Sequence, residues 1–129
     1  MDSIANFLTI IRNGVHASKT FVVAPHSKLS LAIGGILRDE GFIKDCIEIE
    51  QEPGKKALKV VLKYVDGESV IHEIERASKS SLRYYVGART IRPVIGGLGI
   101  SILTTSQGVI TNKKAEQLGV GGEVICTVW

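Results

Sequence analysis

Three adjacent hydroxyl side chains, Thr104, Thr105 and Ser106, stand just before a glycine at position 108. Because hydroxyl groups both donate and accept hydrogen bonds, at a tight turn they can reach the base edges, 2′-hydroxyls and phosphates of a nucleic acid. Gly108 lets such a turn form, since glycine tolerates backbone conformations that other residues avoid. The alternative is a plain hairpin turn rich in Thr and Ser, and spacing alone favours that alternative.

Catalytic patterns are missing from the same region. A Ser106 nucleophile needs a Gly-x-Ser-x-Gly elbow and an identifiable base, and residues 104–108 supply neither. The chain has three histidines, but no pair of them has the spacing of metal ligands. Residues 97–101 lack the third glycine of a phosphate-binding loop and run into an apolar strand. We therefore expect no enzyme activity, no cofactor and no metal site.

Other residues of the carboxy-terminal half are candidates for recognition. Tyr84 or Tyr85 could stack on a base, and because successive strand residues point to opposite faces, we expect the other to lie in the core. Residues 119–122 mark either a close approach to a phosphate backbone or a helix stop followed by a bulge. Cys46 and Cys126 have no Cys-x-x-Cys partner, so we expect reduced, buried thiols rather than a disulfide or metal pair.

Charge is distributed unevenly along the chain. Residues 1–75 contain nine Lys or Arg and eleven Asp or Glu, a net charge of −2, whereas residues 76–129 contain seven and two, a net charge of +5. No acidic residue occurs between Glu75 and Glu116. This asymmetry points to a polyanionic partner for the second half, although many basic faces are simply solvated.

Length and composition limit the class of protein. With 129 residues, 44% of them hydrophobic and 22% charged, the chain fits one compact domain or two small lobes. Its apolar runs are shorter than the roughly 20 residues of a transmembrane helix. The amino terminus has no basic region before an apolar one, so we expect no signal peptide and no membrane partner.

Hydrophobic periodicity predicts the elements of the first half. Apolar residues at helical spacing from Ile4 to Val15 predict a helix capped by Asp2 or Ser3. A strand over 20–24 ends at Pro25, and a second helix begins at Ser27 and stops at Gly41. Alternation from residue 42, a turn at 52–55 and alternation up to residue 64 predict two paired strands.

The second half reads as short strands with one helix. Strands are predicted over 69–76, 82–86, 100–104, 109–111 and 123–129, with a turn at 107–108. A short helix over 113–118 is capped by Thr111 or Asn112 and ended by Gly119. We therefore predict an α+β fold of two small packed lobes. Residues 1–66 form an α-β-α-β-β lobe whose helices cover one sheet face, and residues 67–129 form a mostly antiparallel β lobe with one short helix.

Several segments resemble one family along essentially the whole chain. The sequences GLGI at 97–100, LTTSQGVIT at 103–111 and LGVGGEVIC at 118–126 resemble the carboxy-terminal signature of bacterial small-subunit ribosomal protein number eight. The amino-terminal pairs IA at 4–5 and LT at 8–9, with IRN at 11–13, SKL at 27–29 and EGFI at 40–43, are also similar to that family.

The resemblance implies an RNA-binding scaffold of the small ribosomal subunit. Members of the family bind the central domain of small-subunit ribosomal RNA early in assembly, and can bind a similar shape in their own operon's messenger to repress translation. Carried over by position, the RNA-binding residues are Thr104, Thr105, Ser106, Gly108, Gly121 and Gly122, with Glu123 holding the loop. Arg12, Lys28, Lys79, Arg83 and Tyr85 match the RNA-facing surface less specifically.

This chain departs from the family pattern at three places. Gln107 stands where a lysine is usual, Ile10 replaces an arginine, and residues 79–81 read Lys-Ser-Ser instead of Arg-Pro-Gly. These changes weaken phosphate attraction more than hydroxyl recognition. The resemblance further implies contact with neighbouring ribosomal proteins, number five among them, and a place in the cytoplasmic ribosome, with a plastid ribosome left open. A small hydrolase or transferase, and a protein-interaction module, are the competing hypotheses.

Overall fold

The computed structural model describes residues 3–79 and 81–129, and confirms the α+β class. The chain separates into two compact units, the first unit ending at Ile71 and the second unit running from His72 to Trp129. The boundary between lobes that the sequence predicts after residue 66 stays a prediction.

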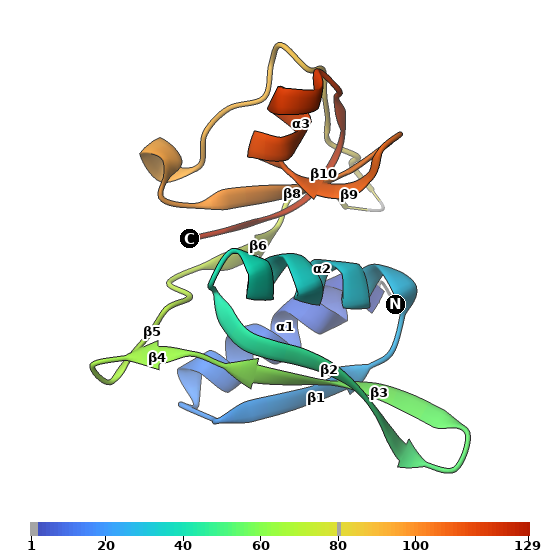
Figure 1. Ribbon diagram of the computed structural model, residues 1–129, viewed down its shortest axis with the longest axis vertical. Helices are drawn as coiled ribbons and strands as arrows, with labels where there is room; N and C mark the ends of the chain where they lie inside the picture. The colour runs from blue at the N-terminus through green and yellow to red at the C-terminus, as the bar shows by residue number, and fades with distance from the viewer. Residues whose placement is uncertain (1–2, 80) are drawn as a thin grey trace. The chain divides into compact units, whose positions relative to one another are not determined.

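The first unit is a three-stranded antiparallel sheet with two helices on one side (Figure 1). The strand order is β1-β3-β2, as expected for the predicted α-β-α-β-β lobe. A short β4–β5 hairpin follows, with its turn at Asp66-Gly67. The elements are α1 (Ser3–His16), β1 (Phe21–Pro25), α2 (Lys28–Asp39), β2 (Ile43–Glu52), β3 (Lys55–Leu62), β4 (Tyr64–Val65) and β5 (Glu68–Ser69).

Both helices of the first unit form where periodicity predicts them. Of the predicted apolar positions of α1, Ile4, Phe7, Leu8 and Ile11 are buried and Val15 is half-buried. Ser27 caps α2, its Oγ accepting the Ser30 N–H at 3.0 Å. For α1, Ser3 is the first helical residue, and the other predicted cap, Asp2, lies outside the described residues.

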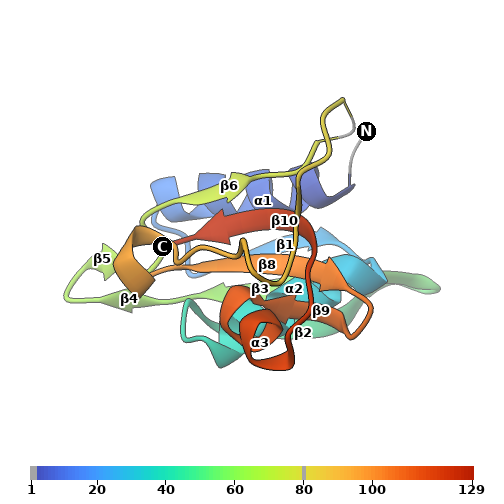
Figure 2. The same cartoon turned by 90° about the horizontal axis from the view of Figure 1, so that it is seen from above.

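The second unit is a twisted antiparallel sheet with one helix across it (Figures 1 and 2). Its strands run in the order β6-β10-β8-β9, and β7 also pairs with β10. Helix α3 packs on Leu103 and Val124 through Ala115. The elements are β6 (Ile74–Arg76), β7 (Tyr85–Val86), the 3₁₀ helix η1 (Ile95–Gly97), β8 (Ile100–Thr105), β9 (Gly108–Thr111), α3 (Asn112–Leu118) and β10 (Gly122–Val128).

Helix α3 begins and ends as predicted. Of the two candidate caps, Thr111 is the one used, and its Oγ1 accepts the Lys114 N–H at 3.2 Å. Asn112 instead accepts the buried Ser101 N–H through Oδ1 at 3.3 Å. Gly119 ends the helix in the left-handed conformation, with φ 69°.

Two predicted strands were wrong in extent. Residues 69–76 are not one strand, because Glu68–Ser69 pairs with β4 whereas Ile74–Arg76 pairs with β10, and the chain changes partner between them. Residues 82–86 form a strand only at 85–86. Lys79 and Leu82 exchange two backbone hydrogen bonds, at 2.9 and 3.1 Å, so Leu82 belongs to a turn and is 74% exposed.

The end of the returning strand in the first unit also differs. The predicted alternation continues the strand of Leu58, Val60 and Leu62 to Tyr64, but that strand, β3, ends at Leu62. Tyr64 lies in β4, and its hydroxyl donates to the Lys19 carbonyl oxygen at 2.7 Å.

The two cysteines are buried and free, as predicted. Cys46 lies in β2 and Cys126 in β10. Burial raises the pKa of the Cys46 thiol and raises the pKa of Cys126 to about 12. Both thiols are therefore protonated and unreactive at neutral pH.

Candidate nucleic-acid interface

The hydroxyl run forms the tip of the β8–β9 hairpin. Thr105 pairs with Gly108, which leaves Ser106 and Gln107 at the turn. Thr105 Oγ1 donates to the Gly108 carbonyl oxygen at 2.9 Å and accepts the Gln107 N–H at 3.0 Å. Gly108 has φ +99°, a value that a side chain would strain. The Thr105 hydroxyl therefore holds the turn together.

Ser106 differs from its neighbour. Its side chain is exposed, and within the described part of the chain its hydroxyl makes no hydrogen bond. Thr104, by contrast, is half-buried in β8. Of the three adjacent hydroxyls, Ser106 is thus the one whose full hydrogen-bonding capacity faces solvent.

Strand pairing places three other predicted residues in one row. Glu123 of β10 lies opposite Tyr85 of β7 on one side and opposite Thr104 of β8 on the other. Residues directly opposite each other in antiparallel strands share a face, with Cβ atoms about 5 Å apart. Tyr85, 69% exposed, thus shares this row with Thr104 and Glu123.

The expectation that one of the two tyrosines lies in the core was wrong. Tyr84 and Tyr85 are 53% and 69% exposed. Tyr84 precedes β7, so strict strand alternation does not apply to it. Its side chain lines a cavity of about 280 Å³ together with Ile91 and Pro93.

Gly121 and Gly122 are required by the close approach of neighbouring strands. A Cβ on Gly121 would lie 2.2 Å from the Val86 carbonyl oxygen, and one on Gly122 would lie 2.2 Å from the Thr104 carbonyl oxygen. The start of β10 is therefore squeezed between β7 and β8. This packing explains both glycines without a nucleic acid, and their RNA contact stays a prediction.

The carboxylate of Glu123 joins two side chains from the 76–84 segment. Its Oε2 accepts hydrogen bonds from Ser78 Oγ and, at 3.0 Å, from Arg83 Nη1. The hydrogen bond from Ser78, with the hydrogen bond and charge of Arg83, holds the pKa of Glu123 below its ordinary value of 4.5. Glu123 is therefore ionised at neutral pH and holds Arg83 at the surface.

Sequence reasoning missed Ser78. It is fully buried, although it lies between Ala77 and the exposed Lys79. Its partner Glu123 is 45 residues away, so no local spacing could reveal the pair. The one available signal is a small polar residue at the end of a predicted strand.

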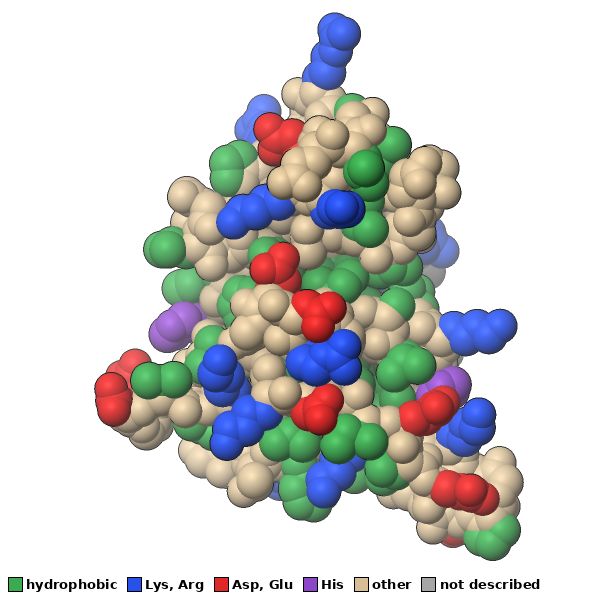
Figure 3. All heavy atoms as spheres, viewed as in Figure 1, with side chains coloured by type: hydrophobic (Ala, Val, Ile, Leu, Met, Phe, Trp, Pro, Cys, Tyr) green, Lys and Arg blue, Asp and Glu red, His purple; other side chains and the backbone are tan. Residues whose placement is uncertain are grey.

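Most cations of the second unit project into solvent, whereas Arg76 is half-buried. Figure 3 shows blue side chains standing out from this unit, with red among them, and more closely interspersed red and blue side chains on the first unit. Side chains that are exposed and form no ion pair among the described residues include Lys79, Arg89, Arg92, Lys113 and Lys114. Together with Arg76 and Arg83, they are the cations of the sequence stretch that lacks acidic residues.

Two predicted RNA-facing residues belong to the first unit. Arg12 lies on α1 and is half-buried, and Lys28 is the exposed first residue of α2. The row of Tyr85, Glu123 and Thr104 belongs to the second unit. Their contact with RNA stays a prediction.

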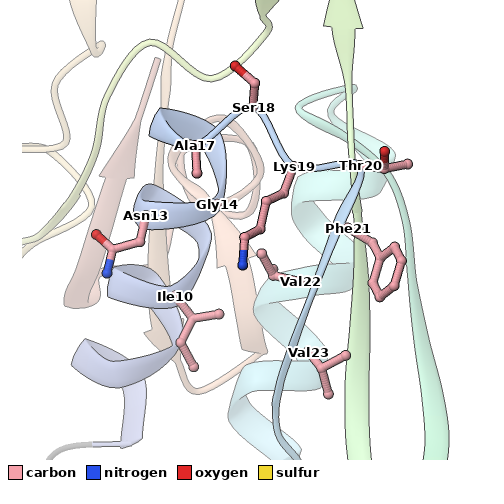
Figure 4. A pocket seen from close by; sticks show the side chains of 10 residues that line it. All are labelled: Ile10, Asn13, Gly14, Ala17, Ser18, Lys19, Thr20, Phe21, Val22 and Val23. Atoms are coloured by element: carbon pink, nitrogen blue, oxygen red, sulfur yellow. The ribbon is translucent and has the colours of Figure 1, made fainter.

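A groove of about 840 Å³ also lies in the first unit, between the end of α1 and β1 (Figure 4). Figure 4 shows the amine of Lys19 between the helix and the strand. Lys19 is the one ionisable side chain among the ten residues that line the groove. The groove therefore lacks the paired acid and base of a hydrolytic site, and none of the predicted RNA-binding residues lines it.

The described residues form neither a metal-binding cluster nor a membrane-spanning helix. Within residues 3–79 and 81–129, no three His, Cys, Asp or Glu side chains gather to hold a metal ion. Over those residues, no helix combines the length and apolar character needed to cross a membrane.

Known proteins that are similar to this chain belong to one family. The family model for ribosomal protein S8 matches residues 2–129. Similar proteins include the small ribosomal subunit protein uS8 of Delftia acidovorans, 48% identical over 98% of this chain and 96% of its own length. The uS8 proteins of Acidovorax sp. strain JS42 and Halothermothrix orenii are 49% and 47% identical, over 98% and 99% of this chain and 96% and 97% of their own lengths. Because the family model matches residues 2–129 and these relatives are 47–49% identical over nearly their whole lengths, this chain belongs to the ribosomal protein S8 family.

Proposed function

We propose that this chain is a structural constituent of the small ribosomal subunit and binds the central domain of small-subunit ribosomal RNA. The observation that carries the proposal is the exposed, unpartnered Ser106 hydroxyl at the hairpin tip, next to the row formed by Tyr85, Glu123 and Thr104. It is supported by family membership and by the relatives, which are small ribosomal subunit proteins.

The three kinds of side chain have different tasks in this proposal. Ser106 exchanges hydrogen bonds with base edges or 2′-hydroxyls, which single-stranded and irregular RNA exposes. Tyr85 offers an exposed ring on which a base can stack. Arg83 and Lys79 bind phosphates, with Arg12 and Lys28 adding contacts from the first unit. Gly108, Gly121 and Gly122 let the protein backbone approach the RNA closely, because they have no side chain that would lie between the backbone and the RNA.

Further parts of the proposal concern partners and place. The chain supports subunit assembly in the cytoplasmic ribosome and contacts neighbouring small-subunit proteins, number five among them. The acidic balance of residues 1–75 makes this part of the chain the better contact for a basic neighbour. The same RNA-binding surface recognises a similar shape in the operon's own messenger, so ribosomal RNA and messenger compete for it.

The proposal makes this chain a binding protein and not an enzyme. A serine nucleophile needs a base within hydrogen-bond reach, and the Ser106 hydroxyl has no such partner among the described residues. Removing Ser106 should therefore change affinity for RNA and abolish no reaction.

A salt titration of RNA binding tests the proposal. The full chain is titrated against a central-domain ribosomal RNA fragment, against a scrambled RNA of equal length, and against a fragment of the operon messenger. We expect saturable binding to the first, competition by the third, and affinity that falls steeply as salt rises because phosphate contacts release counterions. No saturable binding at low salt would show that the chain is not an RNA binder.

A further inference from the structure

The buried hydroxyl of Ser78 links the two ends of the segment between β6 and β7, which carries Arg83. Strand β10 pairs with β6 up to Arg76 and with β7 from Tyr85, so the chain leaves β10 and returns to it. Ser78 N–H donates to the Val124 carbonyl oxygen at 3.0 Å, and Val124 N–H donates to the Tyr84 carbonyl oxygen at 2.9 Å. Ser78 Oγ also accepts the Tyr84 N–H at 3.1 Å. One side chain therefore ties the two ends of the segment together.

The same hydroxyl fixes the carboxylate that holds Arg83. Ser78 Oγ donates to Glu123 Oε2, which also accepts from Arg83 Nη1. Exposure rises along this chain of contacts: Ser78 is 0% exposed, the Glu123 side chain 17% and the Arg83 side chain 50%. The buried Ser78 hydroxyl thus fixes the Glu123 carboxylate, and the carboxylate fixes the exposed guanidinium of Arg83.

The engaged nitrogen leaves the rest of the guanidinium available. Arg83 carries five N–H donors, and its ion pair with Glu123 uses Nη1. The edge formed by Nε and Nη2 matches two oxygens of a phosphate. An arginine held in this way can donate this pair of hydrogen bonds in one direction only, whereas a flexible arginine side chain can adjust to phosphates in different positions.

The position of Glu123 supports this reading, because a carboxylate weakens the attraction of any polyanion. Glu116 and Glu123 are the two acidic residues of 76–129. Glu123 nevertheless lies in the row between Tyr85 and Thr104. Its negative charge lowers the affinity for any RNA. Its ion pair with Arg83, however, favours an RNA that has a phosphate opposite the free N–H groups of the guanidinium.

We infer that Ser78 is a positioning residue that acts through Glu123 to fix Arg83, and that this Ser78–Glu123–Arg83 clamp sets discrimination between RNA shapes rather than total affinity. The inference rests on the proposed RNA binding and names a residue outside the predicted RNA-contacting set.

Two variants and a matched control test the clamp. Glu123→Gln removes the charge that holds Arg83. Glu116→Gln removes one negative charge from an exposed position of α3 that takes part in no side-chain ion pair among the described residues. Ser78→Ala leaves every charge in place and removes the buried hydroxyl. Affinities of the full chain for the central-domain fragment and for the scrambled RNA are measured with each variant, and thermal unfolding shows that each is folded.

The clamp predicts different responses to the same change of charge. Glu116→Gln should raise affinity for both RNAs by the same factor, since it alters only general attraction. Glu123→Gln should raise affinity for scrambled RNA and reduce the ratio of specific to scrambled affinity by about tenfold. Ser78→Ala should leave scrambled binding unchanged and lower the ratio to a similar extent. The double variant Ser78→Ala/Glu123→Gln should lower the ratio of specific to scrambled affinity little more than either single variant does, because Ser78 acts through Glu123.

The outcomes separate the clamp from the proposed function. If Glu123→Gln and Glu116→Gln raise both affinities in parallel, or if the effects of Ser78→Ala and Glu123→Gln simply add, the clamp is overturned while RNA binding stands. If the unmodified chain binds neither RNA, the proposed function fails and the clamp with it. Should Ser78→Ala unfold, the comparison of the two glutamine variants decides alone.

Discussion

Neighbouring hydroxyl groups in the β8–β9 turn have different tasks. Thr105 Oγ1 both donates and accepts inside the turn, whereas Ser106 keeps its hydroxyl for solvent or a ligand. Three residues of one chemical type therefore divide into one that shapes the hairpin, one that is half-buried in the strand and one that is free to recognise a partner. Sequence alone could not make this division, because it depends on which hydroxyl the turn uses.

Ser106→Ala should weaken binding to the central-domain RNA by about 1–3 kcal/mol, because a polar group of the RNA loses its partner. Stability should not change, since the described structure gives the Ser106 hydroxyl no bond to lose. Isothermal calorimetry and thermal unfolding measure the two effects.

Thr105→Val is the matched control for that change. It removes two hydrogen bonds of the turn and should lower the free energy of unfolding by about 1–2 kcal/mol. Equal losses of affinity for specific and scrambled RNA in Ser106→Ala would show that the turn does not discriminate.

The ionisation of Glu123 predicts how stability depends on pH. Its pKa is lowered in the folded chain, first by the hydrogen bond from Ser78 and then by Arg83 and Arg76, and burial opposes this only in part. A lowered pKa contributes stability that is fully present above 4.5, the ordinary value, and is lost as pH falls through the folded value. Chemical unfolding of the unmodified chain and of Glu123→Gln between pH 7 and pH 3 should show a constant difference at neutral pH that shrinks in acid. A difference that stays constant down to pH 3 would show that the carboxylate adds nothing to folding.

Strand β10 is the element on which the candidate interface depends. It pairs with β6, β7 and β8, and it carries Glu123 and Gly122, with Gly121 just before it; both glycines let neighbouring strands approach. Any change that pushes β7 or β8 away from β10 therefore separates Tyr85 and Thr104 from Glu123.

Gly122→Ala should destabilise the chain by about 2 kcal/mol or more, because its Cβ would overlap the Thr104 carbonyl oxygen and the backbone must shift. Gly35→Ala in α2 is the control, since nothing lies within 4 Å of its Cβ and alanine favours a helix by about 1 kcal/mol. Urea unfolding should therefore move in opposite directions for the two variants. Equal stability of Gly122→Ala and the unmodified chain would mean that the strands separate without cost.

Local patterns predicted the helices and most of the strands. The apolar spacing of Phe7, Leu8 and Ile11 identifies α1 because one buried face decides a helix. Alternation over 69–76 misled, since it continues across the point where pairing passes from β4 to β10. Tyr84 misled for a related reason, because it lies just outside the strand that would have alternated. The hydroxyl turn could be found from sequence, whereas the Ser78–Glu123 contact joins residues 45 positions apart.

For the molecule as a whole, charge is divided between the units. The first unit pairs several of its cations with acidic side chains, as Lys55 with Glu52 at 3.9 Å and Lys56 with Glu48 at 3.8 Å. The second unit presents cations such as Lys79 and Arg92 without such partners among the described residues. Long-range attraction of a polyanion therefore belongs mainly to the second unit, and short-range recognition belongs to its hairpin and clamp.

This division predicts where salt dependence originates. Lys79→Gln should flatten the plot of log affinity against log salt concentration by about one unit of slope, because one phosphate contact is lost. Affinity should fall by a similar factor for specific and scrambled RNA, since a phosphate contact carries no sequence information. Lys55→Gln, an equal change of charge at an exposed side chain of the first unit, should leave the slope unchanged. If the two lysine variants flatten the slope equally, attraction arises from the net charge of the whole chain and not from the second unit.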